Sequence, residues 1–290
     1  MFKGFKQQLV TVDGVCINVL KGGQGPGLLL LHGYPQTHVM WHKVAPILAQ
    51  HFSVIVTDLR GYGDSDKPPS DSTHRTYSKK NSGKDQFSVM QSLGYKKFAV
   101  VGHDRGARVG HRMALDYSDY VTRLAVLDIV PTLFAFENTN MEKALGYFHW
   151  FFLAQKSDLP EKLIGADPIF FLHWCLKSWG GSLDYFAPEA LAEYERCFSD
   201  PEVIRATCED YRAASSIDLS DDKNDFERLI NCPVFAMWGK HSAINKWYDV
   251  ADVWRRRAAD LTGGDINARH FLVEENPEDV ARGLFFFLRS

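Results

Sequence analysis

The chain has 290 residues, of which 45% are hydrophobic, and a formal net charge of −3 at neutral pH. This length allows a large domain, or a core with an insertion, to bury a sizeable apolar interior. The nearly balanced charge, with no basic tail, argues against nucleic-acid binding. No uncharged apolar run approaches the length of a membrane span, so we expect no membrane association.

The N-terminal residues and the cysteines favour a cytoplasmic location. Residues 1–8 contain no apolar core followed by a small-residue cleavage site, so we expect no secretory signal. The five cysteines are an odd number at wide spacings, which is typical of reduced thiols in a cytoplasmic protein. No Cys or His pair has the spacing of metal ligands, so we expect no metal site.

The first part of the chain predicts strands that alternate with helices. A β-hairpin is expected where the patterns 7–12 and 15–20 flank Asp13-Gly14. The alternation that follows predicts an α/β fold with a mostly parallel sheet covered by helices on both faces. Its expected buried strands are 28–31, 53–57, 98–102 and 124–128, with helical stretches to about residue 51, over 78–93 and from about 106.

The pattern changes after Pro131. Residues 132–223 contain no convincing strand and are rich in aromatic residues at helical spacing, which predicts a helical cap inserted into the core. The core is then expected to consist of residues 1–131 and 224–290. Its second part begins with a strand over 233–238 and continues with a helix over 246–259, a strand near His270 and a final helix from Pro277.

The strand-to-helix turn Gly102-His103-Asp104-Arg105-Gly106 has the pattern of a nucleophile elbow, Gly-x-nucleophile-x-Gly. Here the nucleophile position is a carboxylate. A carboxylate attacks saturated carbon well and acyl carbon poorly, so the turn predicts displacement at an sp3 carbon through an ester on Asp104. The alternative is that Asp104 only caps the helix that follows, because Asp is a favoured N-cap residue.

Arg105 and Arg108 fall in the first turn of that helix, where the helix dipole disfavours cations. Arg108 shares a helix face with Asp104 because it is four residues further on. Guanidinium groups bind a carboxylate through two parallel hydrogen bonds, so this pair predicts an anionic substrate. The alternative is that Arg108 pairs with a structural acid.

A base and its orienting acid complete the expected site. His270 stands late in the chain, where such a base belongs. The loop after the strand 233–238 holds no acid, so we assign the acid to Asp128, at the end of the preceding core strand. The backbone N–H groups of Tyr34 and Arg105 are the expected oxyanion hole. We expect His32, two residues before Tyr34, to be structural.

Beyond these arguments, the chain resembles the fluoroacetate (haloacetate) dehalogenases of the α/β-hydrolase superfamily over almost its whole length. The resemblance is carried by the elbow 103–108, the stretch 123–132, the pair His149-Trp150, the loop 58–65 and the segment 238–247. Three positions depart from the usual family pattern. Arg269 precedes the base, Val273 replaces a proline, and Tyr34 stands where Phe is more usual.

The resemblance implies roles for residues at matching positions. Asp104 is the implied nucleophile, His270 the base and Asp128 its partner, while Arg105 and Arg108 hold the substrate carboxylate. His149, Trp150 and Tyr211 would donate hydrogen bonds to the departing halide, and all three side chains can donate. Trp179 would line the same pocket. A homodimer is also implied.

The leading hypothesis is therefore hydrolytic dehalogenation of short 2-haloacids to 2-hydroxy acids, without a cofactor. An epoxide hydrolase is the alternative, because it shares the Asp/His/acid machinery and opens the ring with two cap tyrosines. Tyr211 could supply one tyrosine and Tyr147 or Tyr185 the other, but a neutral epoxide leaves Arg105 and Arg108 unexplained. A third hypothesis is an inactive hydrolase fold that binds a small carboxylate as a sensor or carrier.

Overall fold

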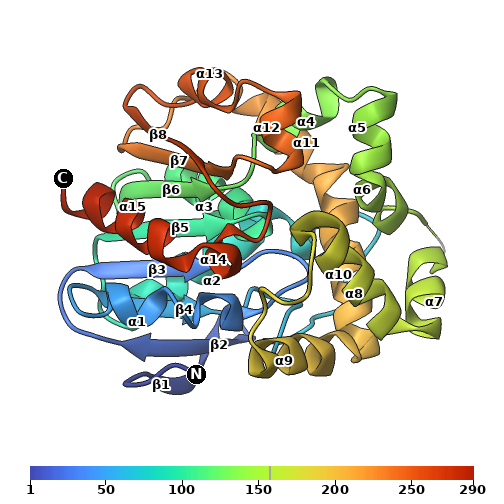
Figure 1. Ribbon diagram of the computed structural model, residues 1–290, viewed down its shortest axis with the longest axis horizontal. Coiled ribbons are helices and arrows are strands. Elements are labelled where there is room, and N and C mark those ends of the chain that lie inside the picture. Colours follow the sequence, from blue (N-terminus) through green and yellow to red (C-terminus); the bar gives the residue numbers. More distant parts are fainter. Residues whose placement is uncertain (157) are drawn as a thin grey trace.

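The computed structural model describes residues 1–156 and 158–290. Its centre is an eight-stranded sheet in the order β1-β2-β4-β3-β5-β6-β7-β8 (Figure 1). The strand β2 runs antiparallel to both β1 and β4, and the other neighbours are parallel. The strands are β1 Lys6–Val12, β2 Val15–Gly22, β3 Gly27–Leu31, β4 Ser53–Thr57, β5 Phe98–His103, β6 Val121–Leu127, β7 Val234–Gly239 and β8 Leu261–Ile266.

Helices cover both faces of this sheet, which explains why every residue of β3, β4 and β5 is buried. In Figure 1, α1 and α15 lie in front of the sheet, and α3 lies behind it. The core helices are α1 Ala45–Leu48, α2 Lys79–Ser92, α3 Arg105–Asp116, α12 Ala243–Trp247, α13 Val250–Arg255, α14 Leu272–Glu275 and α15 Pro277–Arg289, with the short 3-10 helices His38–Trp41 and Arg75–Tyr77.

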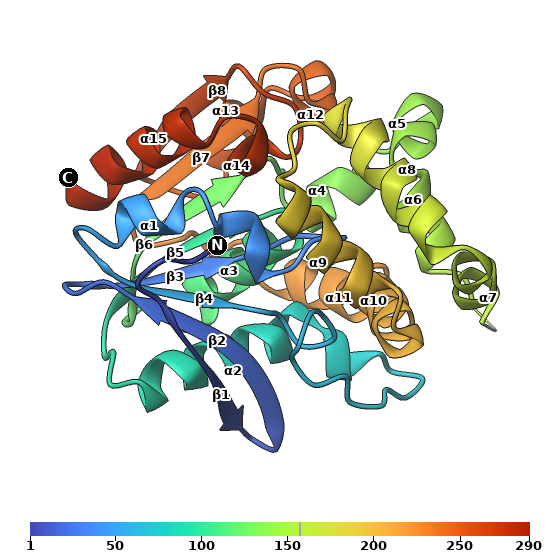
Figure 2. The same ribbon diagram turned by 60° about the horizontal axis from the view of Figure 1, so that its bottom comes forward.

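A cap of helices joins β6 to β7. Both views place α6, α8 and α10 of this cap on the same side of the sheet (Figures 1 and 2). Among the described residues, no helix is both long and apolar enough to cross a membrane. The cap helices are α4 Thr132–Glu137, α5 Met141–Gly146, α6 Phe148–Leu153, α7 Leu159–Ala166, α8 Pro168–Gly180, α9 Pro188–Phe198, α10 Pro201–Ala214 and α11 Ile217–Asn224.

The predicted sheet agrees with the observed one, but two late elements differ. The helix expected over 246–259 is divided into α12 and α13, because Tyr248 is extended between them and Asp249 caps the second helix. The last strand ends at Ile266, four residues before His270. This edge strand contains Gly263 and Gly264, and glycine is uncommon inside strands, so the sequence pattern does not indicate a strand here. A Cβ at Gly263 would lie 1.8 Å from the carbonyl oxygen of Ala236.

Candidate active site

The turn between β5 and α3 has the geometry of a nucleophile elbow. Asp104 adopts φ 45° and ψ −114°, a conformation that costs energy for a residue with a side chain. The flanking glycines make the turn possible: a Cβ at Gly102 would lie 2.4 Å from the Gly106 oxygen, and one at Gly106 would lie 2.4 Å from the His32 oxygen. The same turn brings Gly33 against Asp104, where a Cβ would lie 2.5 Å from the Asp104 Cβ.

The Asp104 carboxylate does not cap α3, so the capping alternative is wrong. Instead, Oδ1 accepts a hydrogen bond of 2.9 Å from the backbone N–H of Tyr34, in the loop after β3. Burial alone would raise the pKa of Asp104, but the charges of His270 and Arg108 outweigh it and lower the pKa to about 2. Asp104 is thus ionised at neutral pH.

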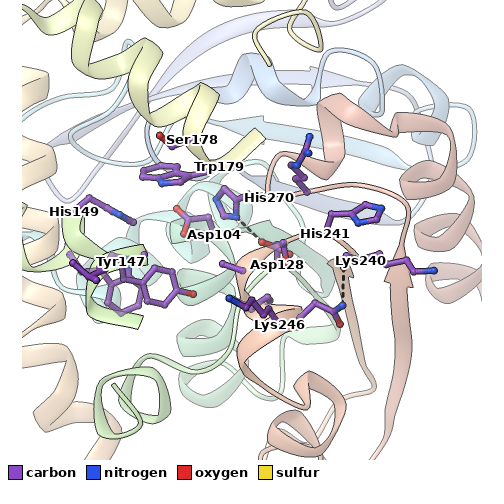
Figure 3. Close-up of a pocket in the computed structure, with 18 of the residues that line it drawn as sticks. Asp104, Asp128, Tyr147, His149, Ser178, Trp179, Lys240, His241, Lys246 and His270 are labelled. Atoms are coloured by element: carbon purple, nitrogen blue, oxygen red, sulfur yellow. Dashed lines mark hydrogen bonds and ion pairs between the residues drawn. The ribbon is translucent and has the colours of Figure 1, made fainter. Parts of the chain in front are cut away.

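His270 and Asp128 form a directed pair beside Asp104 (Figure 3). Nδ1 of His270 lies 2.7 Å from Oδ2 of Asp128, and Oδ1 of Asp128 accepts a 2.9 Å hydrogen bond from Gly239 N. An ionised carboxylate can only accept, so Nδ1 carries the proton and Nε2 is left as a base. Burial lowers the pKa of His270, but the hydrogen bond and charge of Asp128 outweigh it and raise the pKa above 6.5.

Arg105 does not show the contacts expected of it. Its Nε donates to Oδ2 of Asp210 at 2.7 Å, and Nη2 donates to the Asp210 backbone oxygen at 2.8 Å. The guanidinium lies 4.2 Å from the centre of the Tyr211 ring. Only Nη1 is buried without a hydrogen-bond partner among the described residues. Asp210 therefore takes two of the five N–H donors of Arg105, which the sequence assigned to the substrate carboxylate.

Arg108 differs from Arg105 in its charge partners. The sequence left open that Arg108 pairs with a structural acid, but the structure shows such a pair at Arg105. Within residues 1–156 and 158–290, no carboxylate forms a salt bridge with Arg108. Its Nη1 donates at 3.0 Å to Val130 O and to Thr132 Oγ1, and its guanidinium lies 4.6 Å from the Trp150 ring centre. Nε is buried without a protein partner in the described part.

The cap supplies an aromatic wall opposite Asp104. His149 lies between Trp179 and Tyr211, with ring centroids 4.3 and 5.7 Å away, and its Nδ1 is buried without a partner in the part described. Burial lowers the pKa of His149 to about 3, so the ring is neutral. Burial, followed by the charge of Asp104, raises the pKa of Tyr211 well above its usual value, so the phenol keeps its proton. Both side chains can therefore donate at neutral pH.

These groups surround one cavity of about 500 Å³. In Figure 3, His149 and Tyr147 lie on one side of Asp104, and His241 and Lys240 lie on the other. Arg105 is fully buried and does not line the cavity wall. The predicted site residues that line it are Asp104, Arg108, Asp128, His149, Trp150, Trp179, Tyr211 and His270.

Three further residues take part in the site. Sequence analysis assigns no role to His103 or Asp210, and it names Tyr147 only for the epoxide hydrolase alternative. Tyr147 stacks on Trp150 at 4.8 Å. His103 lies 2.7 Å from the His270 carbonyl through Nε2, and burial lowers the pKa of His103 to about 4, so the neutral ring donates this bond. Asp210 holds Arg105. The first two adjoin recognised motifs, whereas Asp210 reaches Arg105 across 105 residues of sequence.

Among the residues that the structure describes, one group of potential metal ligands lies outside this cavity. Asp64, Glu193 and Cys197 place ligand atoms within 4.8 Å of one another. Arg196, however, forms salt bridges with both carboxylates, at 2.7 and 2.6 Å. A side chain of the protein therefore already offsets one of the two negative charges.

Comparison with known proteins agrees with this geometry. A family model of the alpha/beta hydrolase fold matches residues 26–277. The chain is 45% identical to fluoroacetate dehalogenase of Burkholderia sp over 289 residues, 99% of this chain and 95% of that protein. It is 34% identical to soluble epoxide hydrolase of Corynebacterium sp. (strain C12) over 273 residues, 93% and 92% of the two chains. ALR0039 from Nostoc sp PCC 7120, a solved structure, matches with a TM-score of 0.98 and 53% identity over 99% of both chains.

The elbow, the sheet and these matches define the class: the chain belongs to the α/β-hydrolase fold family. Within that family, the predicted resemblance to fluoroacetate dehalogenases is confirmed by the nearly full-length match to the Burkholderia protein.

Proposed function

We propose that the protein hydrolyses the carbon–halogen bond of short 2-haloacids, such as fluoroacetate or chloroacetate. The observation that carries this proposal is the lining of one cavity, which brings Asp104 and His270 together with Arg108, a cation that forms no salt bridge with any described carboxylate. His149, Trp150 and Tyr211, whose side chains can donate hydrogen bonds, line the same cavity. A small acid that carries a halide offers partners to this cation and to these donors.

The first step forms an ester on Asp104. One carboxylate oxygen attacks the substrate Cα, and the halide leaves from the opposite side with the bonding electron pair. The backbone N–H of Tyr34 holds Oδ1, so the other oxygen is the one free to attack. Arg108, which lines the cavity, orients the substrate carboxylate, and the buried charge of Arg105 adds to the attraction of the anion. This orientation converts a bimolecular encounter into an aligned one.

The departing halide needs donors in a site that excludes water, and fluoride needs them most because it is a poor leaving group. His149, Trp150 and Tyr211 are the proposed donors. Each is at most 5% exposed, and each lines the cavity. The neutral state of His149 fits this role, because one of its ring nitrogens carries a hydrogen while the ring adds no charge that would bind the halide product too tightly.

The second step hydrolyses the ester. Nε2 of His270 takes a proton from water, and the resulting hydroxide attacks Cγ of Asp104. We expect the N–H of Tyr34, which already binds Oδ1, and the N–H of Arg105 to stabilise the oxyanion that forms. Collapse of the oxyanion breaks the bond between Cγ and the ester oxygen. That oxygen takes the proton back from Nε2 of His270 and leaves as the hydroxyl of the 2-hydroxy acid, while one water oxygen stays on Asp104.

Epoxide hydrolysis is the second candidate, because two cap tyrosines, Tyr147 and Tyr211, line the cavity with Asp104. The epoxide hydrolase relative shares 34% of the aligned residues. The charges favour the acid: Arg108 faces the cavity, and no described carboxylate forms a salt bridge with it. A neutral epoxide would leave this cation uncompensated.

The test is halide release by the purified protein from fluoroacetate and chloroacetate, with styrene oxide hydrolysis measured in parallel and Asp104→Asn as the inactive control. A single turnover in H₂¹⁸O locates the attacking oxygen: the label should appear in the peptide that carries Asp104, and not in the first 2-hydroxy acid released. Diol formation with no halide from either acid would establish the epoxide hydrolase instead.

A further inference from the structure

Arg105 belongs to a chain of three buried charged side chains. It connects Lys79 in α2, Asp210 in α10 and Arg105 in α3, so it ties the cap to the core beside the nucleophile. The three side chains are at most 6% exposed. Burial raises the pKa of Asp210, but the charges of Arg105 and Lys79 outweigh it and hold the pKa well below the usual range. Asp210 is therefore a permanent anion between two cations.

The contacts fix the Arg105 guanidinium in position, tilt and rotation. Asp210 receives Nε and Nη2 of Arg105 on two different oxygens, and the Tyr211 ring lies against the guanidinium. The carboxylate is itself fixed, because one oxygen pairs with Lys79 and the other accepts a 2.9 Å hydrogen bond from the Tyr62 hydroxyl. Nη1 has no hydrogen-bond partner in the described structure.

Charge explains why this restraint matters. Arg105 is adjacent to Asp104 in the sequence, and its charge already helps to lower the pKa of Asp104. A guanidinium released from Asp210 would find Asp104 as a competing carboxylate in the same site. An ion pair between Arg105 and Asp104 would occupy the attacking oxygen and the place of the substrate carboxylate together.

We infer that Asp210 is a positioning residue for substrate binding: it holds Arg105 away from Asp104, so that the attacking oxygen and the place of the substrate carboxylate stay free. Lys79 supports it by fixing the second carboxylate oxygen. This inference rests on the proposed function, because it assumes that the anion bound here is a small 2-substituted acid. It assigns recognition of the acid to a cap–core ion chain and not to the two arginines alone.

The experiment compares the wild type with Asp210→Asn, Arg105→Met and the double variant. Glycolate affinity is measured by calorimetry, and halide release from chloroacetate gives KM and kcat. Asp210→Asn should weaken glycolate binding and raise KM at least tenfold. Since Asp210 acts through Arg105, the double variant should bind no more than threefold worse than Arg105→Met. Glu202→Gln, which removes an exposed acid of α10 that pairs with Arg205, is the matched control and should change binding less than threefold.

Two results would overturn the inference: wild-type glycolate affinity in Asp210→Asn, or effects of Asp210→Asn and Arg105→Met that simply multiply in the double variant. If the wild type binds glycolate but releases no halide, the proposed function fails and the binding data still decide the role of Asp210. If it does neither, both fail. Should Asp210→Asn not fold because Lys79 keeps only its 3.8 Å pair with Asp218, Lys79→Met/Asp210→Asn removes both charges and is compared with Lys79→Met alone.

Discussion

Replacing Asp128 by Asn tests the division of the reaction into two steps. The side chain keeps its size but loses the charge that faces Nδ1 of His270 at 2.7 Å. A charge-assisted hydrogen bond contributes about 1.5–3 kcal/mol, which corresponds to about one to two units of the His270 pKa. The amide can also turn its NH₂ toward Nδ1, which moves the ring proton to Nε2 and removes the base. The same substitution in a Ser-His-Asp triad lowers kcat by about 10⁴ for this reason.

The expected result is specific to ester hydrolysis. Asp104 is ionised without help from a base, so the first turnover should still release about one equivalent of halide at a rate within a few fold of wild type. Later turnovers should slow by roughly 10³–10⁴, and the ester should accumulate as a mass increase on the Asp104 peptide. Rapid-quench halide measurement and mass spectrometry follow the two events.

The pH dependence gives an independent check. Hydrolysis needs neutral His270, whose pKa is raised above 6.5, so the wild-type rate should fall as the pH drops through that raised pKa. Asp128→Asn should move this fall to lower pH while reducing the maximum rate. Equal slowing of the first and later turnovers, or an unchanged pH profile, would refute the assignment of Asp128 to the hydrolysis step.

Three further substitutions test other parts of the site. Trp150→Phe keeps the ring that stacks on Tyr147 but removes the indole N–H, so fluoride release should fall at least tenfold more than chloride release; equal losses would contradict a role as halide donor. Arg108→Lys should raise KM for chloroacetate at least tenfold, because the planar fork is lost, and an unchanged KM would exclude a carboxylate contact. Gly33→Ala places a methyl group 2.5 Å from the Asp104 Cβ and should abolish halide release, whereas Gly165→Ala meets no atom within 4 Å and should keep full activity; a wild-type rate in Gly33→Ala would show that the loop can move.

The sequence predicts the elements that follow local rules. Buried strands read as continuous apolar runs, and the elbow reads as two glycines around Asp104, because a close backbone approach leaves no room for a Cβ. The sequence misplaces the strand that contains Gly263, because Gly263 is needed for close contact with β7 and not for local strand preference. Sequence patterns report constraints between residues that are close in the chain. Gly263 is constrained by the Ala236 backbone, which is distant in the chain and close in space.

The charge partner of Arg105 is likewise invisible to a local sequence pattern, because it is distant in the chain. Arg105 and Arg108 both fall in the first turn of α3, where the helix dipole disfavours a cation, and this position predicts an anionic partner for them. Nothing local reveals that Asp210 compensates Arg105 while Arg108 stays without a carboxylate partner in the described part. Asp210 lies one residue before Tyr211 on a cap helix, and its side chain reaches the core only because α10 packs there. The identity of the site was therefore accessible from the motifs, and the assignment of its charges was not.

The two site carboxylates illustrate how environment sets chemistry. Asp104 and Asp128 follow the adjacent strands β5 and β6, and both adopt positive φ, at 45° and 52°. This strain turns each side chain out of the sheet edge toward the cavity. Asp104 meets a backbone N–H and nearby cations, which hold it ionised as a nucleophile. Asp128 is held by Gly239 N and faces His270, so its charge acts only through that ring. The proposed roles of the two aspartates therefore differ because their partners differ, although both residues have positive φ.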